Sequence, residues 1–261
     1  MVNWFRNTEI AYWITSFVGG LGFALFGIFG QKPWLILLAL VWIFVMAIVF
    51  SVVAQKKYNK IVSLMNDECR CNDYVEQTNA ILSRCKNKKN RNLLLINLSA
   101  GYLNLGNTEF ARQVFGCLEP FADTPRGAYE KAVYLNNLFL YHLLLKDIEN
   151  AGLVLAEFKK TIDGGKIPKL HQDRLFDCYA DRVMDLRMEQ GDFDGAEAYF
   201  ALAIEKKRCR MATVSAKYNL AKCYLHAGKT EQAKQAFLFV AENGGDSLDA
   251  AAAKKKLAEL T

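Results

Sequence analysis

The stretch GDFDGAEAYFALAIE, residues 191–205, predicts a helix that begins abruptly. Gly191 and Asp192 are turn and capping residue types, so they mark its start. Apolar residues then recur at spacings of three and four, at Phe193, Ala196, Phe200 and Ala203. This spacing places them on one face of the helix, where small and large side chains alternate. The stretch therefore predicts a helix that lies closely against a second helix.

Nearly the same sequence pattern occurs in five segments along the chain. The segments are CNDYVEQTNAI (71–81), LGNTEFARQVF (105–115), LKDIENAGLVL (145–155), QGDFDGAEAYF (190–200) and AGKTEQAKQAF (227–237), and their starts lie 34, 40, 45 and 37 residues apart. The seventh residue is Ala111, Ala151, Ala196 or Ala233, with Gln77 in the first segment, and the eleventh is Ile81, Phe115, Leu155, Phe200 or Phe237. Such a period indicates stacked helical repeats, because one repeat alone cannot bury its apolar face.

Another amphipathic helix is predicted before each of these five segments. LLINLSAGYL (94–103) and KYNLAKCYL (217–225) both carry Asn-Leu, a small residue and a tyrosine three residues later, and YLNNLFLYHL (134–143) is bulkier. Together with the five segments that follow them, these helices resemble the tetratricopeptide repeat family. The fifth repeat matches the family pattern through Leu220, Ala221, Tyr224, Gly228, Ala233 and Phe237, and the second through Leu98, Ser99, Tyr102, Gly106, Ala111 and Phe115.

The resemblance covers roughly residues 58–246. The fourth repeat carries Met184 and Arg187 at the small and aromatic positions of its first helix, and the first and third repeats are degenerate. The resemblance implies an all-α solenoid of about five repeats over residues 58–261, with a C-terminal capping helix. We place that helix at DSLDAAAAKKKLAEL (246–260), where Asp246 and Ser247 are capping residue types.

One position in the first helices is the candidate partner-binding site. The residues there are Asn97, Asn137 and Asn219, with Arg182 in the fourth repeat. The resemblance implies that this position lies near a concave groove, where asparagine can hold the backbone of an extended peptide. An asparagine amide both donates and accepts hydrogen bonds, so it suits a peptide group of any sequence. The alternative is that asparagine is present here only as part of the repeat pattern.

The first part of the chain contains two long uncharged stretches. IAYWITSFVGGLGFALFGIFG (10–30) and WLILLALVWIFVMAIVFSVVA (34–54) are each long enough to cross a bilayer as a helix of about 31 Å. Only three residues separate them, which predicts an antiparallel transmembrane hairpin within an anchor of residues 1–57. Small residues recur along the first stretch, at Ser16, Gly20, Ala24 and Gly27. Such a stripe allows close helix approach, so we expect it to face the second span.

Basic residues indicate the orientation of the hairpin. Lys56, Lys57 and Lys60 follow the second span and Arg6 precedes the first, whereas the short loop contains only Lys32. This bias favours an integral membrane protein with two spans and both termini in the cytoplasm. Anionic lipid headgroups are expected to contact Lys56 and Lys57 and the basic turn at Lys207 and Arg208.

Few features of the sequence suggest chemistry. Seven scattered cysteines among 261 residues are typical of free thiols in a reducing compartment, and three histidines form no ligand-spaced motif with Cys69 and Cys71. No phosphate-binding glycine loop or nucleophile motif is present. A net charge of +6 is modest for this length. We therefore expect no enzyme activity, no cofactor, no metal and no nucleic-acid partner.

These observations predict a membrane-anchored repeat scaffold that binds a protein or peptide partner in its concave groove and contacts membrane lipids. Two alternatives stay open at this point. The hairpin itself shapes the bilayer, or the chain is a subunit of a membrane or secretion complex, with the repeats regulatory in either case.

Overall fold

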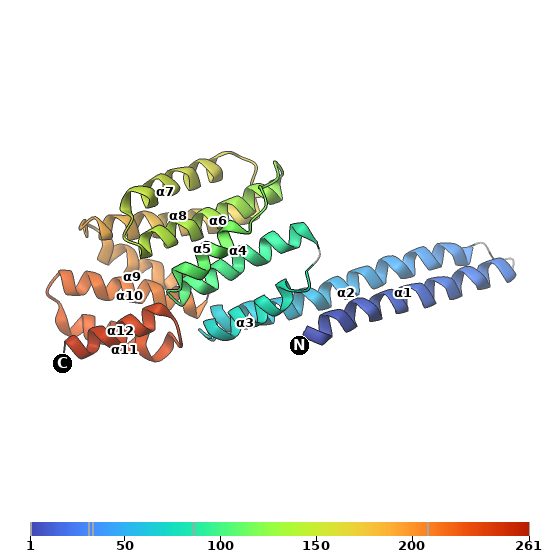
Figure 1. Cartoon of the computed structure of the whole chain (residues 1–261), viewed down its shortest axis with the longest axis horizontal. Helices are drawn as coiled ribbons and strands as arrows, with labels where there is room; N and C mark the ends of the chain where they lie inside the picture. The colour runs from blue at the N-terminus through green and yellow to red at the C-terminus, as the bar shows by residue number, and fades with distance from the viewer. Residues whose placement is uncertain (1, 31, 33, 86, 208, 261) are drawn as a thin grey trace. The chain divides into compact units, whose positions relative to one another are not determined.

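The described part of the chain is entirely helical. The computed structural model describes residues 2–30, 32, 34–85, 87–207 and 209–260, and these residues form twelve helices and no strand (Figure 1). The all-α prediction is confirmed. The chain divides into two compact units, Met1–Val62 and Ser63–Thr261. This division falls inside a continuous helix, whereas the predicted boundary between anchor and repeats lies at 57/58.

The first unit contains two apolar helices, α1 (Val2–Phe29) and most of α2 (Trp34–Asn66). Both are long and apolar enough to cross a membrane. Only 17% of the apolar window in α1 and 6% of that in α2 is buried inside the protein, so these helices are not a buried core. The second helix continues past the predicted span end at Ala54 and carries Lys56 and Lys57 on the same helix.

Small residues of α1 face α2, as predicted. Ser16, Gly20 and Gly27 are buried along this line. A Cβ atom added to Gly20 would lie 3.2 Å from Cδ1 of Ile43, and one added to Gly27 would lie 3.1 Å from Cγ1 of Ile36. Both distances are shorter than ordinary carbon contacts, so the two helices approach closely because these side chains are absent.

The tightest approach in the hairpin is at Gly19. A Cβ atom there would lie 2.2 Å from Nε1 of Trp42. The indole N–H donates a hydrogen bond to the carbonyl oxygen of Thr15, with an N···O distance of 3.3 Å. The missing side chain therefore allows an indole to reach the backbone of α1.

The second unit contains ten further helices. They are α3 (Cys71–Leu82), α4 (Lys88–Asn104), α5 (Thr108–Gly116), α6 (Pro125–Leu144), α7 (Ile148–Asp163), α8 (Lys169–Glu189), α9 (Ala196–Lys206), α10 (Arg210–His226), α11 (Thr230–Asn243) and α12 (Leu248–Glu259). Neighbours in sequence pack as antiparallel partners, for example α4 with α5, α6 with α7 and α10 with α11 (Figure 1). Alternate helices also pack, since α6 contacts both α4 and α8, and α10 contacts α12.

The alternation of small and large residues is the basis of this packing. Ala111, Ala151, Ala196 and Ala233 each have an exposed fraction of 0%. The large residue four positions later is also buried in the last three of these helices, at Leu155, Phe200 and Phe237. A face that alternates in this way lets the partner helix approach at the alanine while the large side chain fills the space beside it.

The turn inside each repeat adopts a left-handed backbone. Gly106, Gly191 and Gly228 have φ angles of +73°, +87° and +71°. The corresponding residue of the third repeat is Lys146, with φ of +59°. A side chain in this region costs about 1–2 kcal/mol, which glycine avoids. The third repeat thus has the same turn as its neighbours although its sequence is degenerate.

The two ends of the second unit are joined by Asp246, which lies between α11 and α12. Its Oδ1 accepts a hydrogen bond from the backbone N–H of Cys71 at 2.6 Å. Its Oδ2 accepts from the backbone N–H of Asn72 at 2.9 Å and from the side-chain amide of Asn72 at 2.7 Å. Asp246 therefore caps the first turn of α3, to which the N-cap residue Arg70 contributes no side-chain hydrogen bond.

This contact corrects one prediction. Asp246 does not cap the helix that follows it, because its carboxylate is bonded to the start of α3. Ser247 alone caps α12, with its hydroxyl accepting from the N–H of Ala250 at 3.3 Å. The final helix is therefore not a free outer layer, since the residue before its cap returns to the beginning of the unit.

Apolar contacts support the same junction. Cys69 and Cys71 have an exposed fraction of 0% and share one buried cluster with Val214, Phe237 and Ala253. The last helix also meets the turn between α4 and α5, since a Cβ atom on Gly106 would lie 2.9 Å from Cδ1 of Leu248. Hydrogen bonds and apolar burial thus act together at the place where the two ends meet.

Replacing Asp246 with alanine is expected to leave the first amides of α3 without their acceptor. Loss of a helix cap costs about 0.5–2 kcal/mol. Hydrogen exchange at Cys71 and Asn72 should become faster, and the thermal midpoint should fall. Asp173→Ala, at an exposed position of α8, is the matched control. Unchanged exchange at the two amides would contradict the capping contact.

Replacing Ala233 with leucine is expected to destabilise the packing of α10 against α11. Overpacking a filled core costs about 1–3 kcal/mol, and Ala233 has no exposed surface. Ala251→Leu, at an exposed position of α12, should leave stability nearly unchanged. Thermal unfolding of both variants tests the repeat register, which is wrong if the two midpoints agree.

Replacing Gly19 with valine is expected to separate α1 from α2, because the new side chain collides with the indole of Trp42. Gly22→Val is the control, since nothing lies within 4 Å of a Cβ atom at that position. The thermal midpoint of the hairpin in detergent micelles should fall only for the Gly19 variant. A similar loss in both variants would point to a general effect of valine.

Candidate interaction surface

The four predicted groove residues lie on four successive alternate helices. Asn97 is on α4, Asn137 on α6, Arg182 on α8 and Asn219 on α10. Three of them belong to one continuous line of hydrogen bonds, which we call the polar series. Its members are Ser99, Asn136, Asn137, Arg182, Asp185 and Asn219.

Asn137 connects α6 to α4. Its side-chain amide donates to the carbonyl oxygen of Ile96 at 2.9 Å and to the hydroxyl of Ser99 at 3.1 Å. Its own side-chain oxygen accepts from the amide of Asn136 at 3.2 Å. Only 3% of Asn137 is exposed, so its amide is not available to a peptide in a groove, which corrects the expectation for this residue. Its amide instead pairs buried groups that would otherwise lose hydrogen bonds on folding.

Arg182 and Asn219 extend the series across α8 and α10. Nε of Arg182 donates to the side-chain oxygen of Asn136 at 2.9 Å, and Nη1 lies 2.5 Å from Oδ2 of Asp185. The amide of Asn219 donates to Oδ1 of the same carboxylate at 2.7 Å. The side chain of Arg182 is 19% exposed, so it is largely buried but keeps some contact with solvent.

Asn97 has a different environment. It is partly exposed on α4, and its backbone oxygen accepts a hydrogen bond from the hydroxyl of Tyr74 at 3.1 Å. The structure therefore brings Asn137, Arg182 and Asn219 together and places Asn97 toward α3.

A row of acidic residues on α8 was missed by the sequence reasoning. Asp181, Asp185 and Glu189 occur at every fourth position, which is the signal that reveals them. Each carboxylate binds groups from other helices or turns. Glu189 accepts from Lys146 at 2.5 Å and Lys222 at 3.0 Å. The row therefore links α8 to the turn after α6 and to α10.

Burial and hydrogen bonding shift the pKa values of the acidic groups in this region. It raises the pKa of Asp185, and the nearby guanidinium of Arg182 opposes the change. It also raises the pKa of Asp249 on α12, although a hydrogen bond from Ser215 acts in the other direction. For Glu189, burial raises the pKa but the two lysine hydrogen bonds outweigh it, so the net pKa is lowered. Asp185 and Glu189, one turn apart on α8, thus have pKa shifts of opposite sign.

The basic residues expected at the lipid surface fall into three cases. Lys56 is exposed on α2 and Lys57 is partly exposed. The side chain of Lys207 is only 14% exposed, and its ammonium lies 2.6 Å from Oδ2 of Asp181. Lys207 therefore does not project toward lipid headgroups, which corrects the expectation for that residue. Arg208 lies outside the described residues.

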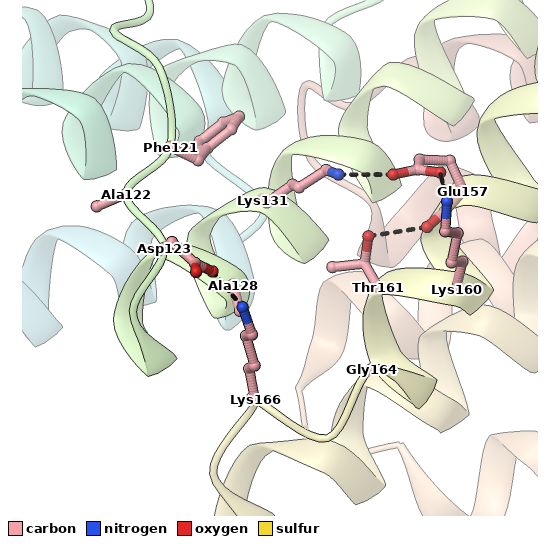
Figure 2. A pocket seen from close by; sticks show the side chains of 11 residues that line it. Phe121, Ala122, Asp123, Ala128, Lys131, Glu157, Lys160, Thr161, Gly164 and Lys166 are labelled. Atoms are coloured by element: carbon pink, nitrogen blue, oxygen red, sulfur yellow. Dashed lines mark hydrogen bonds and ion pairs between the residues drawn. The ribbon is translucent and has the colours of Figure 1, made fainter.

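A pocket of about 330 Å³ lies between the start of α6 and the end of α7. Figure 2 shows Lys131, Lys160 and Lys166 around it. Lys131 lies 2.6 Å from Oε1 of Glu157, and Lys160 lies 3.9 Å from Oε2. No cluster of three or more histidine, cysteine, aspartate or glutamate residues within the described ranges could hold a metal ion.

The two acidic groups with opposite pKa shifts predict opposite pH dependence. Asp249→Asn removes a carboxylate whose pKa is raised, so wild-type stability relative to the variant should fall as pH rises above about 3.9, the unfolded value. Glu189→Gln removes a carboxylate whose pKa is lowered. The stability of the wild type relative to this variant should be greatest above about pH 4.3 and should disappear in acid. Denaturant unfolding across this range tests both signs, and parallel curves would contradict the assignment.

Comparison with protein-family models, curated proteins and solved structures finds no match to this chain in any of the three.

Proposed function

We propose that this chain is a membrane-anchored helical scaffold that holds a protein partner at the cytoplasmic surface of a membrane. The observation that carries the proposal is the pair of long apolar helices, α1 and α2, whose apolar windows are only 17% and 6% buried. Transferring apolar surface from water into lipid gains roughly 25 cal/mol per Å². Exposed side chains such as Phe17, Phe29 and Phe44 would be costly in water and favourable in a bilayer.

The proposal also assigns an orientation. Lys56 and Lys57 follow the second span on the same helix, and the short loop between the spans offers only Lys32. Positive residues near span ends favour the cytoplasmic side. Both termini are therefore assigned to the cytoplasm.

The second unit is proposed to be a solenoid that resembles the tetratricopeptide repeat family. Three observations support this assignment. A fully buried alanine occurs in α5, α7, α9 and α11. A left-handed residue follows each of α4, α6, α8 and α10. Alternate helices α4, α6 and α8 pack in series. Repeats with this organisation commonly present extended binding surfaces.

The partner is proposed to contact the partly exposed members of the groove position, Asn97, Arg182 and Asn219. An extended peptide could hydrogen-bond to their amide and guanidinium groups. Two of them already bind Asp185, so a peptide contact must replace an existing hydrogen bond. A new hydrogen bond is worth about 0.5–1.5 kcal/mol net, and one that replaces an existing hydrogen bond is worth less, so binding depends on contacts across several repeats. A basic or amide-rich peptide segment would suit the carboxylates beside these residues.

The orientation is tested with a C-terminal tag and protease added outside sealed cells. We expect the tag to stay intact, because both termini lie inside. Permeabilised cells are the control, in which the tag should disappear. Digestion of the tag in sealed cells would overturn the orientation.

The partner surface is tested by placing a photo-crosslinking amino acid at Asn97 or Asn219. Adducts with a partner protein are expected at these positions. Gln235, exposed on the outer helix α11, is the control position and should give no adduct. Adducts at Gln235 alone would move the interaction to the outer helices.

The role of the hairpin is tested by exchanging residues 1–54 for an unrelated two-span anchor. A scaffold should keep its crosslinked partner after the exchange, since the groove is unchanged. Loss of the partner would favour the alternative in which the hairpin shapes the bilayer or joins a membrane complex.

A further inference from the structure

The connection between α7 and α8 combines positive charge with an exposed apolar residue. Residues 159–170 contain Lys159, Lys160, Lys166 and Lys169. Leu170, in the first turn of α8, has an exposed fraction of 83%. This is the highest value among the large apolar side chains whose burial is described, including Phe29 of α1 at 82%. We call residues 159–170 the basic connector.

The positive charge of the basic connector is only partly neutralised. With Lys131 of α6, the surface has five lysines and three nearby carboxylates. Lys159 lies 2.7 Å from Asp163, Lys166 pairs with Asp123, and Glu157 pairs with Lys131. These are solvent-exposed pairs, which are weak and readily exchanged for another anion.

Other charges do not cancel this surplus. Lys160 is 82% exposed, and its ammonium lies 3.9 Å from Oε2 of Glu157, whose Oε1 pairs with Lys131. Lys169 is also exposed. One turn further along α8, Asp173 and Arg174 offset one another. The basic connector therefore presents a net positive surface.

A pocket adjoins the basic connector. Lys131, Lys160 and Lys166 line it together with Thr161 (Figure 2). Its volume of about 330 Å³ is within the range that small polar ligands occupy. The ring of His171, directly after Leu170, packs against Tyr129 of α6 with centroids 4.6 Å apart. This contact fixes the first turn of α8 beside the pocket.

We propose that the basic connector docks on an anionic phospholipid surface. Headgroup phosphates lie between Lys160, Lys166 and Lys169, and Leu170 enters the interfacial layer of the bilayer. Lysines close to an anionic membrane are attracted to its surface potential, and an apolar side chain beside them gains by leaving water. The proposal rests on the proposed anchoring, which keeps the second unit close to a membrane. It assigns to this segment the lipid contact that Lys207 cannot make, because that side chain is paired with Asp181.

The test uses the full chain reconstituted in vesicles of phosphatidylcholine alone or of phosphatidylcholine with phosphatidylserine. Hydrogen exchange of residues 159–170 is followed by mass spectrometry. We expect several-fold slower exchange only in the vesicles that contain phosphatidylserine. Equal exchange in the two vesicle types would overturn the docking proposal.

Two pairs of variants separate docking from a general effect of charge or polarity. Lys160→Glu with Lys166→Glu should abolish the protection, whereas Lys254→Glu with Lys255→Glu, exposed on α12, should keep it. Leu170→Ser should weaken it, whereas Leu202→Ser, 62% exposed on α9, should not. Loss of protection in the control variants as well would overturn the proposal. Circular dichroism of each variant checks that the helices remain folded.

Two further measurements identify the source of any effect. Inorganic phosphate added to phosphatidylcholine vesicles should leave exchange unchanged, and protection by phosphate alone would overturn the assignment to lipid. Alkaline extraction of the same vesicles reports on the anchor. If the chain is retained and exchange is insensitive to phosphatidylserine, docking fails and anchoring stands. If the chain is extracted, anchoring fails whatever the exchange shows.

Discussion

The close approach of paired helices at four fully buried alanines is the constraint on which the second unit depends. Ala111, Ala151, Ala196 and Ala233 are fully buried, so a larger side chain at any of them would have to displace the packed neighbours. The equivalent residue of α3 lies five positions after the left-handed Cys69 and is the buried Tyr74, so the predicted equivalence of Gln77 is wrong. The first repeat therefore needs other means of holding its helix.

Two such means are present around α3. Gly101 of α4 permits close approach, since a Cβ atom there would lie 2.7 Å from Cγ2 of Val75. Asp246 supplies the cap that the local sequence does not. Helix α3 is thus held by its close contact with Gly101 and by a capping residue from the far end of the unit. The polar series also favours one arrangement of the helices, because a buried charged group that loses its partner destabilises the protein.

Local periodic features were predictable from the sequence, and long-range polar contacts were not. The alanine pattern and the small-residue face of α1 follow from helical spacing, which each segment shows by itself. The capping type of Asp246 was recognised, but its partner lies 175 residues away and no local pattern identifies it. The burial of Asn137 and the ion pair of Lys207 depend on which polar group of a neighbouring helix lies opposite. Spacing within one segment does not show which polar groups lie opposite one another. The acidic row on α8 was the one sequence signal for these contacts.

The joining of the two ends has a consequence for synthesis of the chain. Helix α3 is made early, but its first amides are capped by a residue that the ribosome adds 175 positions later. Closing so long a loop has a high entropy cost, and folds dominated by distant contacts form slowly. Until Asp246 emerges, Cys69 and Cys71 lack part of the cluster that buries them. The nascent chain therefore exposes apolar surface in the segment that follows α2 until translation reaches Asp246, and it is prone to aggregation during that time.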